Sequence, residues 1–184
     1  MSAVAEESLL IAGFGGQGIL LAGRILAEAA LVAGKEVVWV PAYGPEVRGG
    51  TANCIVKVAE GQIGSVTVNE PDVLLVLNRP SFLKYEPLVK PGGLLLVNSS
   101  LVPDKSTRTD ITIVEVDASL VAEELGTVKA ANMVMVGALA ACRDWLQLDL
   151  LEETLKTVLS GKLVKLIPLN LAAIQQGYAL AGGR

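Results

Sequence analysis

The sequence predicts a three-layer α/β/α domain. Several short apolar runs show no polar alternation, which is typical of strands covered on both faces. A glycine-rich turn separates the first of these runs from an apolar helical segment. One later segment, Thr51–Ala59, does alternate and is expected at the margin of the sheet. These observations favour a Rossmann-like, mostly parallel central sheet with an antiparallel hairpin at one edge.

The first half of the chain supplies most of the expected strands. We expect strands at the apolar runs Leu9–Ala12, Val37–Val40, Val73–Leu77 and Leu94–Val97. Residues 19–32 are apolar with a narrow polar line, as in a crossover helix. A shorter helix is expected over residues 81–89, because Pro91-Gly92-Gly93 then ends it.

The alternating segment is expected to form the edge hairpin. Cys54, Val56 and Val58 share one face of Thr51–Ala59, and a Glu60-Gly61 turn follows. Residues 63–68 are therefore predicted to be its partner strand. Residues 111–116 read as a further strand, and the chain is predicted to be helical from Ala118 onward.

The segment Ala130–Cys142 carries no charge and is apolar on every side. A helix of this kind is buried, either in a large core or at a subunit interface. Because a domain of this size has little room for a central helix, the sequence favours a partner subunit.

Composition narrows the classes of protein. The 184 residues are expected to form one domain, 1–184. Charged residues make up only 18%, which suggests that part of the surface is hidden against a partner. The net charge of −4 and the lack of a basic cluster argue against nucleic acid. Neither a basic leader segment nor a membrane span is apparent, so we expect a cytoplasmic protein without a membrane partner.

The chain contains no histidine and only two cysteines, Cys54 and Cys142. A histidine base, a histidine-dependent triad and a histidine metal ligand are therefore excluded. Two distant thiols cannot supply the ligands of an iron–sulfur cluster or a structural zinc site. We expect no catalytic residue and no metal or cofactor bound by this chain alone.

The glycine turn could bind an anion. Gly13, Gly15 and Gly18 have the G-x-G-x-x-G spacing, with Gly16 and Gln17 between them. Such a turn directs free backbone N–H groups of a helix start at one point. A dinucleotide site also needs an acid at the end of the second strand, and that strand ends in Pro41-Ala42. The alternative is that the glycines serve only tight turning and packing.

A second cluster follows the expected second strand. It presents one acid, Glu46, and one fixed cation, Arg48, which can hold a phosphate or carboxylate with paired hydrogen bonds. The glycines in it would let a backbone or ligand approach closely. Ligand contact and a subunit-interface ion pair remain equally open. The candidate residues of this cluster are Tyr43, Gly44, Glu46, Arg48, Gly49 and Gly50.

Four amide side chains are further candidates. Gln17 could orient a ligand or satisfy nearby backbone groups. Asn78 and Asn98 follow strand ends and could line one crevice, although turn formation is the favoured alternative. Asn132 lies in the apolar helix, where a hydrogen bond to a neighbouring loop is favoured over a ligand.

Together, these motifs resemble the gamma subunit, or gamma domain, of 2-oxoacid:ferredoxin oxidoreductases. The glycine turn and the Tyr43–Gly50 cluster carry the resemblance most specifically. Further matches follow in order from about Leu9 to about Gly177. They are Asn78, Pro91-Gly92-Gly93, Asn98, residues 132–139 from Asn132 through Gly137, and residues 170–174 leading to Gly177.

The resemblance implies a subunit that is inactive alone. Such enzymes oxidatively decarboxylate a 2-oxoacid on thiamine diphosphate, pass electrons through iron–sulfur clusters to ferredoxin and release an acyl-CoA. Thiamine diphosphate, Mg and the clusters are expected in partner subunits: alpha, the beta subunit that carries thiamine diphosphate, and a ferredoxin-like delta. This chain would complete the complex and could touch coenzyme A; isolated, it could form a homo-oligomer.

Two alternatives remain beside this interpretation. One is the equivalent subunit of indolepyruvate:ferredoxin oxidoreductase, which shares the domain. The other is a stand-alone nucleotide-binding Rossmann-like protein. The sequence does not separate pyruvate, 2-oxoglutarate, 2-ketoisovalerate and aryl-pyruvate as substrates.

Overall fold

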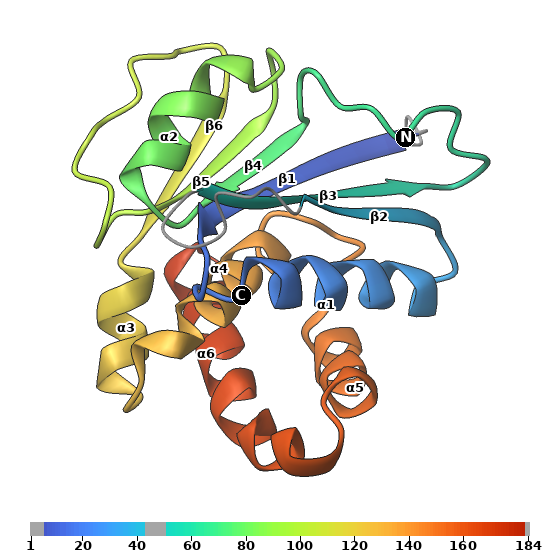
Figure 1. Ribbon diagram of the computed structural model, residues 1–184, viewed down its shortest axis with the longest axis vertical. Helices are drawn as coiled ribbons and strands as arrows, with labels where there is room; N and C mark the ends of the chain where they lie inside the picture. Colours follow the sequence, from blue (N-terminus) through green and yellow to red (C-terminus); the bar gives the residue numbers. More distant parts are fainter. Residues whose placement is uncertain (1–5, 43–50, 183–184) are drawn as a thin grey trace.

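The computed structural model describes residues 6–42 and 51–182, and within them a single sheet of six strands in the order β2-β3-β1-β4-β5-β6 (Figure 1). Three neighbouring pairs, β1·β4, β4·β5 and β5·β6, are parallel. Two pairs, β1·β3 and β2·β3, are antiparallel. The predicted α/β fold, mostly parallel with an antiparallel edge, is confirmed. The strands are β1 (Glu6–Phe14), β2 (Glu36–Ala42), β3 (Thr51–Ala59), β4 (Val73–Val76), β5 (Leu94–Asn98) and β6 (Thr112–Val116).

The antiparallel edge is built differently from the prediction. Residues 63–68 form no strand, so the expected partner of Thr51–Ala59 was wrong. β3 instead pairs with β1 on one side and β2 on the other. Both of its hydrogen-bonding edges are thus occupied, which leaves no place for a further strand beside it.

The helices cover the two faces of the sheet unequally. Five of them lie on one face and its end, whereas α2 covers the other (Figure 1). None of the helices in the described part of the chain is long and apolar enough to cross a membrane. The helices are α1 (Ile19–Val32), α2 (Arg79–Tyr85), α3 (Ala118–Glu124), α4 (Ala131–Ala140), α5 (Leu148–Val158) and α6 (Ile167–Leu180), with 3-10 turns η1 (Glu86–Leu88), η2 (Val128–Ala130) and η3 (Gly161–Leu166).

The core explains why the strand sequences do not alternate. In β1, Leu9 and Ile11 belong to the larger hydrophobic cluster, which the sheet shares with α1, α4 and α6. Leu10 and Ala12 face the smaller cluster that contains Phe82 of α2. Because both faces of the central strands are covered, apolar residues are favoured at consecutive positions.

Helix α4 is buried by its own chain. Each of its ten residues is buried, and α6 is its main partner. A methyl group on Gly137 would overlap the Ile174 backbone of α6, and one on Gly177 would overlap the Val134 backbone of α4. The two helices therefore cross in near backbone contact. The inference of a partner subunit from this helix was wrong, because α6 already covers it.

Candidate functional site

The carboxyl ends of β1 and β4 mark the point where the chain changes direction across the sheet. From β1 the chain passes through α1 to β2 on one side, whereas β4 leads to β5 and β6 on the other. Open α/β sheets bind ligands in the crevice at such a switch point. The glycine turn follows β1, and Asn78 follows β4, so both predicted motifs lie at this carboxyl edge.

The glycine turn leaves backbone donors free. Gly18 ends the turn with a φ of 73° and precedes α1, which has neither a side-chain cap nor an acid in its first turn. A methyl group on Gly18 would overlap the Asn132 carboxamide. Within the described residues, the N–H groups of Gly16 and Gly18 donate no hydrogen bond. The positive end of the α1 dipole and these donors favour an anion at the turn.

A network of amides holds the turn in place. The Gln17 side chain accepts a hydrogen bond from Phe14 N (2.6 Å) and donates one to Leu77 O (3.2 Å). Asn78 donates weakly to Gln17 Oε1 (3.5 Å) and accepts from Ser81 N (2.9 Å). The latter bond caps α2 at its amino end, as the favoured alternative of turn formation predicts.

The other two amides also have internal partners. Asn98 donates to Ser119 Oγ (2.9 Å) and to Leu77 O (3.4 Å), and it accepts from Ser119 N (3.2 Å). It thereby ties β5 to the first turn of α3. Asn132 donates to Gly18 O (3.0 Å), which confirms the favoured hydrogen bond to the loop. These amides position the edge, and the N–H groups of Gly16 and Gly18 remain without a partner among the described residues.

The six candidates from Tyr43 to Gly50 lie outside the described residues. The chain on either side of them is described. Ala42 ends β2, and Thr51 pairs with Phe14 at the end of β1. These two described positions therefore lie at the carboxyl edge, near the glycine turn.

A crevice of about 300 Å³ opens at this edge. Among the described residues, its one ionisable side chain is Lys129 of η2, which is exposed and makes no ion pair with a described residue. We did not identify Lys129 or Ser119 from the sequence, since neither lies in a recognisable motif. The lining residues are Gly16, Gln17, Leu77, Leu101, Ser119, Val128, Lys129 and Ala131.

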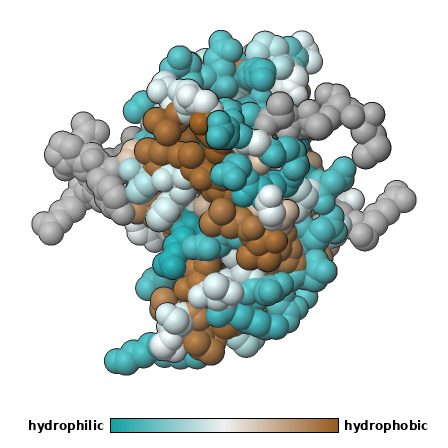
Figure 2. Space-filling view, turned by 90° about the vertical axis from the view of Figure 1, so that its right-hand side faces the viewer, coloured by the Kyte–Doolittle hydropathy of each residue, from teal (hydrophilic) through white to brown (hydrophobic). Residues whose placement is uncertain are grey.

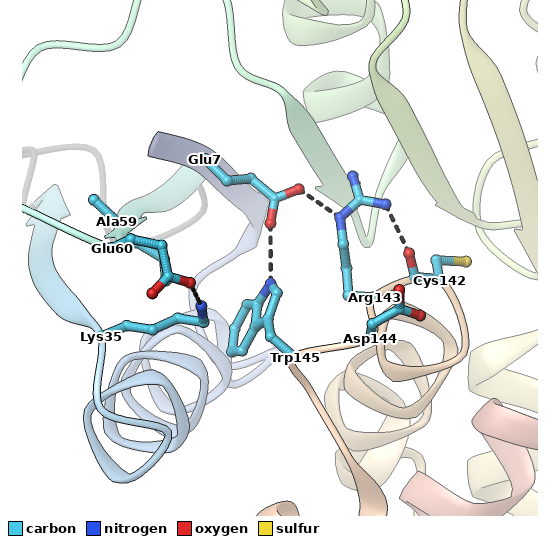
Figure 3. A pocket seen from close by; sticks show the side chains of 9 residues that line it. Glu7, Lys35, Ala59, Glu60, Cys142, Arg143, Asp144 and Trp145 are labelled. Atoms are coloured by element: carbon cyan, nitrogen blue, oxygen red, sulfur yellow. Dashed lines mark hydrogen bonds and ion pairs between the residues drawn. The ribbon is translucent and has the colours of Figure 1, made fainter. Parts of the chain in front are cut away.

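A larger hollow, of about 530 Å³, lies at the opposite, amino edge of the sheet. Figure 3 shows Glu7 pointing at Arg143 and Trp145 from across this pocket. Glu7 accepts hydrogen bonds from Arg143 Nε and from Trp145 Nε1 (3.1 Å). Lys35 and Glu60 form a second ion pair on its far side. The contacts of Glu7 with Arg143 and Trp145 join β1 to the turn after α4 across the pocket. We call these three residues the amino-edge clasp.

A neighbouring cluster strengthens the amino edge. Asp72 accepts hydrogen bonds from Ser8 N (2.9 Å), Ser8 Oγ (2.7 Å) and Lys90 Nζ (2.9 Å). Burial alone would raise the pKa of Asp72, but the hydrogen bonds from Lys90 and Ser8 hold it below its usual value. The cluster fastens the beginnings of β1 and β4 to each other.

The exposed surface of this side is mixed. Figure 2 looks at the side of the molecule where β1 begins and α1 ends, and apolar patches there are separated by hydrophilic side chains. Leu31 and Val32 at the end of α1 are about half exposed, at 53% and 49%. We therefore see no continuous apolar face on this side.

The cysteines are poor candidates for chemistry. Burial raises the pKa of Cys54 to about 12, so its thiol is neutral at pH 7. Cys142 lies just past α4 and is half-buried, which also raises its pKa. The described residues contain no group of three or more side chains that could hold a metal ion.

The sheet order also bears on dinucleotide binding. In a dinucleotide fold the second strand lies beside the first, so that its terminal acid reaches the ribose. Here β3 lies between β1 and β2, and β2 ends in Pro41-Ala42. The glycine turn therefore lacks both the acid and the strand that would present it.

Comparison with known proteins decides the family. The model of the pyruvate ferredoxin/flavodoxin oxidoreductase family matches residues 8–180. The chain belongs to this family. The predicted resemblance to its gamma subunits is thus confirmed.

Individual members of the family match over nearly the whole chain. A 2-oxoglutarate synthase subunit KorC of Methanocaldococcus jannaschii is 37% identical, over 96% of this chain and 94% of its own length. A ketoisovalerate oxidoreductase subunit VorA of Methanothermobacter marburgensis is 38% identical over 94% of this chain. The chain spans only 36% of the VorA length.

A solved structure shares both fold and sequence. The gamma subunit of a keto/oxoacid ferredoxin oxidoreductase from Geobacter sulfurreducens superposes with a TM-score of 0.81. It is 32% identical, and the match covers 95% of this chain and 98% of that one. That gamma subunit therefore shares the architecture described above.

Proposed function

We propose that this chain is the gamma component of a 2-oxoacid:ferredoxin oxidoreductase. The observation that carries the proposal is the family match over residues 8–180, supported by an oxoacid-enzyme subunit of similar length. The assembled enzyme would decarboxylate a 2-oxoacid, transfer the resulting acyl group to the CoA thiol and pass the released electrons to ferredoxin. Thiamine diphosphate, Mg and the iron–sulfur clusters would be held by partner subunits of this cytoplasmic complex.

The carboxyl edge is the surface that this chain would contribute. Its exposed apolar side chains, Phe14, Leu101 and Val128, are 39%, 45% and 57% exposed around the crevice. Exposed apolar groups beside open backbone donors are typical of a surface that a partner or ligand covers. The partners would be the alpha and beta subunits and a ferredoxin-like delta subunit.

Residues 43–50 would act at the same edge. Arg48 offers a fixed cation to the phosphates of CoA or to the carboxylate of the oxoacid. Its alternative role is an ion pair with Glu46 at a subunit interface. If Arg48→Ala raises KM for CoA or the oxoacid in a complex of unchanged stoichiometry, Arg48 contacts a ligand. Unchanged Michaelis constants would assign it to assembly.

Anaerobic affinity purification of the tagged chain from its native cell tests the proposal. We expect a thiamine-diphosphate subunit and an iron–sulfur subunit to purify with it. The complex should reduce a viologen dye only when both a 2-oxoacid and CoA are present. A chain that purifies alone, or a complex without this activity, would contradict the proposal.

The same complex distinguishes the substrates. Relatives named for ketoisovalerate and 2-oxoglutarate enzymes favour an aliphatic oxoacid. We expect kcat/KM to be highest for one of these acids or for pyruvate. The highest kcat/KM for indolepyruvate would instead support the alternative subunit.

A stand-alone nucleotide-binding protein is the second class of function. The strand order and the Pro41-Ala42 terminus argue against it. Titration calorimetry of the isolated chain with NADH and NADPH tests this alternative. We expect no heat of binding at micromolar concentrations.

A further inference from the structure

A second, mostly aliphatic pocket adjoins the crevice at the glycine turn. We call it the leucine pocket. Its volume is about 260 Å³, and five of its lining residues are leucines: Leu21, Leu159, Leu163, Leu166 and Leu169. Gly16 and Lys129 border both hollows. The charged and apolar parts of the leucine pocket are thus brought together by segments far apart in the sequence.

Asn170 of α6 provides the most informative side chain of this pocket. It lines the pocket and is only 8% exposed. Its carboxamide makes no hydrogen bond with any described residue, in contrast to Gln17, Asn78, Asn98 and Asn132. Its polar atoms remain accessible from the pocket, since the fully buried side-chain atoms without a partner among the described residues are Trp39 Nε1 and Ser81 Oγ. The Asn170 amide is therefore available to a polar ligand.

The remaining polar groups of the pocket select the charge of that ligand. The unpaired N–H groups of Gly16 and Gly18 lie at the amino end of the 14-residue helix α1. Lys129 lines the same pocket and offers an ammonium group as donor. Among the described residues, no acidic side chain lines it. Donors and a cation without a counter-charge favour an anion.

We infer that the leucine pocket binds a small aliphatic carboxylate. The two carboxylate oxygens would accept from Lys129, from the glycine turn and from the Asn170 amide. The aliphatic part would lie against the leucines, where its burial from water is favourable. One cation matches one negative charge, and the volume suits a ligand of a few carbon atoms. The inference rests on this chain alone and does not depend on the activity of the complex.

Binding to the full 184-residue chain tests the inference directly. Titration calorimetry would compare isovalerate with two probes: isovaleramide, which lacks the charge, and inorganic phosphate, which lacks the aliphatic part. We expect isovalerate to bind with a Kd below about 1 mM, a strength reasonable for a ligand of this size. The other two should bind at least about tenfold more weakly. Equal binding of phosphate, or no binding of isovalerate, would overturn the inference.

A matched pair of lysine variants locates the site. Lys129→Gln removes the cation of the pocket, and Lys162→Gln removes an exposed lysine of η3 that does not line it. We expect Lys129→Gln to weaken isovalerate binding about tenfold, as for loss of a charge-assisted hydrogen bond. Lys162→Gln should leave it unchanged. An equal effect of both substitutions would mean diffuse attraction to the surface and would overturn the site.

Asn170→Leu separates binding from structure. If the amide serves a ligand, replacing it by an aliphatic side chain should weaken isovalerate binding and leave Tm unchanged or higher. If it serves the fold, Tm should fall while binding persists, which would contradict the inference. Circular dichroism melts and calorimetry on the same samples give both readouts.

Discussion

The two edges of the sheet differ in how completely their polar groups are satisfied. At the amino edge, Glu7 is bonded by Arg143 and Trp145, and Asp72 by Ser8 and Lys90. At the carboxyl edge, three kinds of polar group find no partner among the described residues: the N–H groups of Gly16 and Gly18, the Lys129 ammonium and the Asn170 amide. The amino-edge pocket is nevertheless the larger, about 530 Å³ against 300 Å³ for the crevice.

The contrast shows that cavity size is a poor guide to function in this fold. A pocket whose charges are already paired has little left to offer a ligand, and breaking such a pair destabilises the fold because one charge loses its partner. A smaller pocket with unmet donors retains the capacity to bind. We therefore assign stability to the amino edge and recognition to the carboxyl edge.

The largest effect is expected at the glycine turn. Gly18→Ala places a side chain in a left-handed conformation and drives it into Asn132. Strain together with the loss of the Asn132–Gly18 hydrogen bond should lower the unfolding free energy by about 2–4 kcal/mol. Urea denaturation measures this change. Gly61→Ala is the control, because a methyl group there meets open space and should change little. Equal effects would show that the turn is not held by Asn132.

A smaller loss is expected from the amino-edge clasp. Glu7→Gln removes the counter-charge of Arg143. The Glu7 side chain is only 11% exposed, so Arg143 loses its partner at a largely buried position. Because Arg143 itself is 24% exposed, the cost should stay near 1–3 kcal/mol, roughly half that of a fully buried pair. Isovalerate binding should not change.

The control for the clasp is Glu60→Gln, since Glu60 pairs with Lys35 from a side chain that is 58% exposed. Urea denaturation should detect little change for it. If the Glu7→Gln variant bound isovalerate more weakly, binding would depend on the amino edge. That result would contradict the assignment of different roles to the two edges.

The smallest effect is tied to pH. The pKa of Asp72 is lowered in the folded chain, so its stabilising effect is present above its usual value of 3.8 and is lost as the pH falls through the folded value. Asp72→Asn should cost about 1 kcal/mol at neutral pH. The difference from the wild type should shrink as the pH falls below 3.8. Urea denaturation from pH 7 to pH 2 would show this convergence, and a constant difference would rule out the charge as its cause.

Elements that are specified by a pattern of many residues were predicted correctly. The buried strands and the long helices follow from apolar runs, because covered strands such as β4 and β5 exclude polar side chains. Residues 63–68 were predicted to be a strand because they follow the Glu60-Gly61 turn, but β1 and β2 already occupy both edges of β3. The prediction for α4 was wrong for a different reason, because its apolar surface packs against α6. Gly137 and Gly177 are the residues that allow this close crossing.

The site was predicted in part. The glycine turn and the amides were placed at one edge, because residues after parallel strands meet there. Lys129 and Asn170 were missed as site residues, since only the folded chain brings residues 16–18, 129 and 170 to one pocket. Asn170 stood within a recognised motif, but nothing in the sequence indicates that its amide is left unpaired.

Hydrogen–deuterium exchange of the assembled complex tests the division between the two edges most directly. We predict that amides of residues 15–18 and 128–131 exchange fast in the isolated chain and slow down on assembly with partner subunits, because the carboxyl edge becomes covered. Amides of residues 59–62 and 142–146 at the amino edge should keep their rates. Protection confined to the amino edge would contradict the account and assign recognition to the clasp instead.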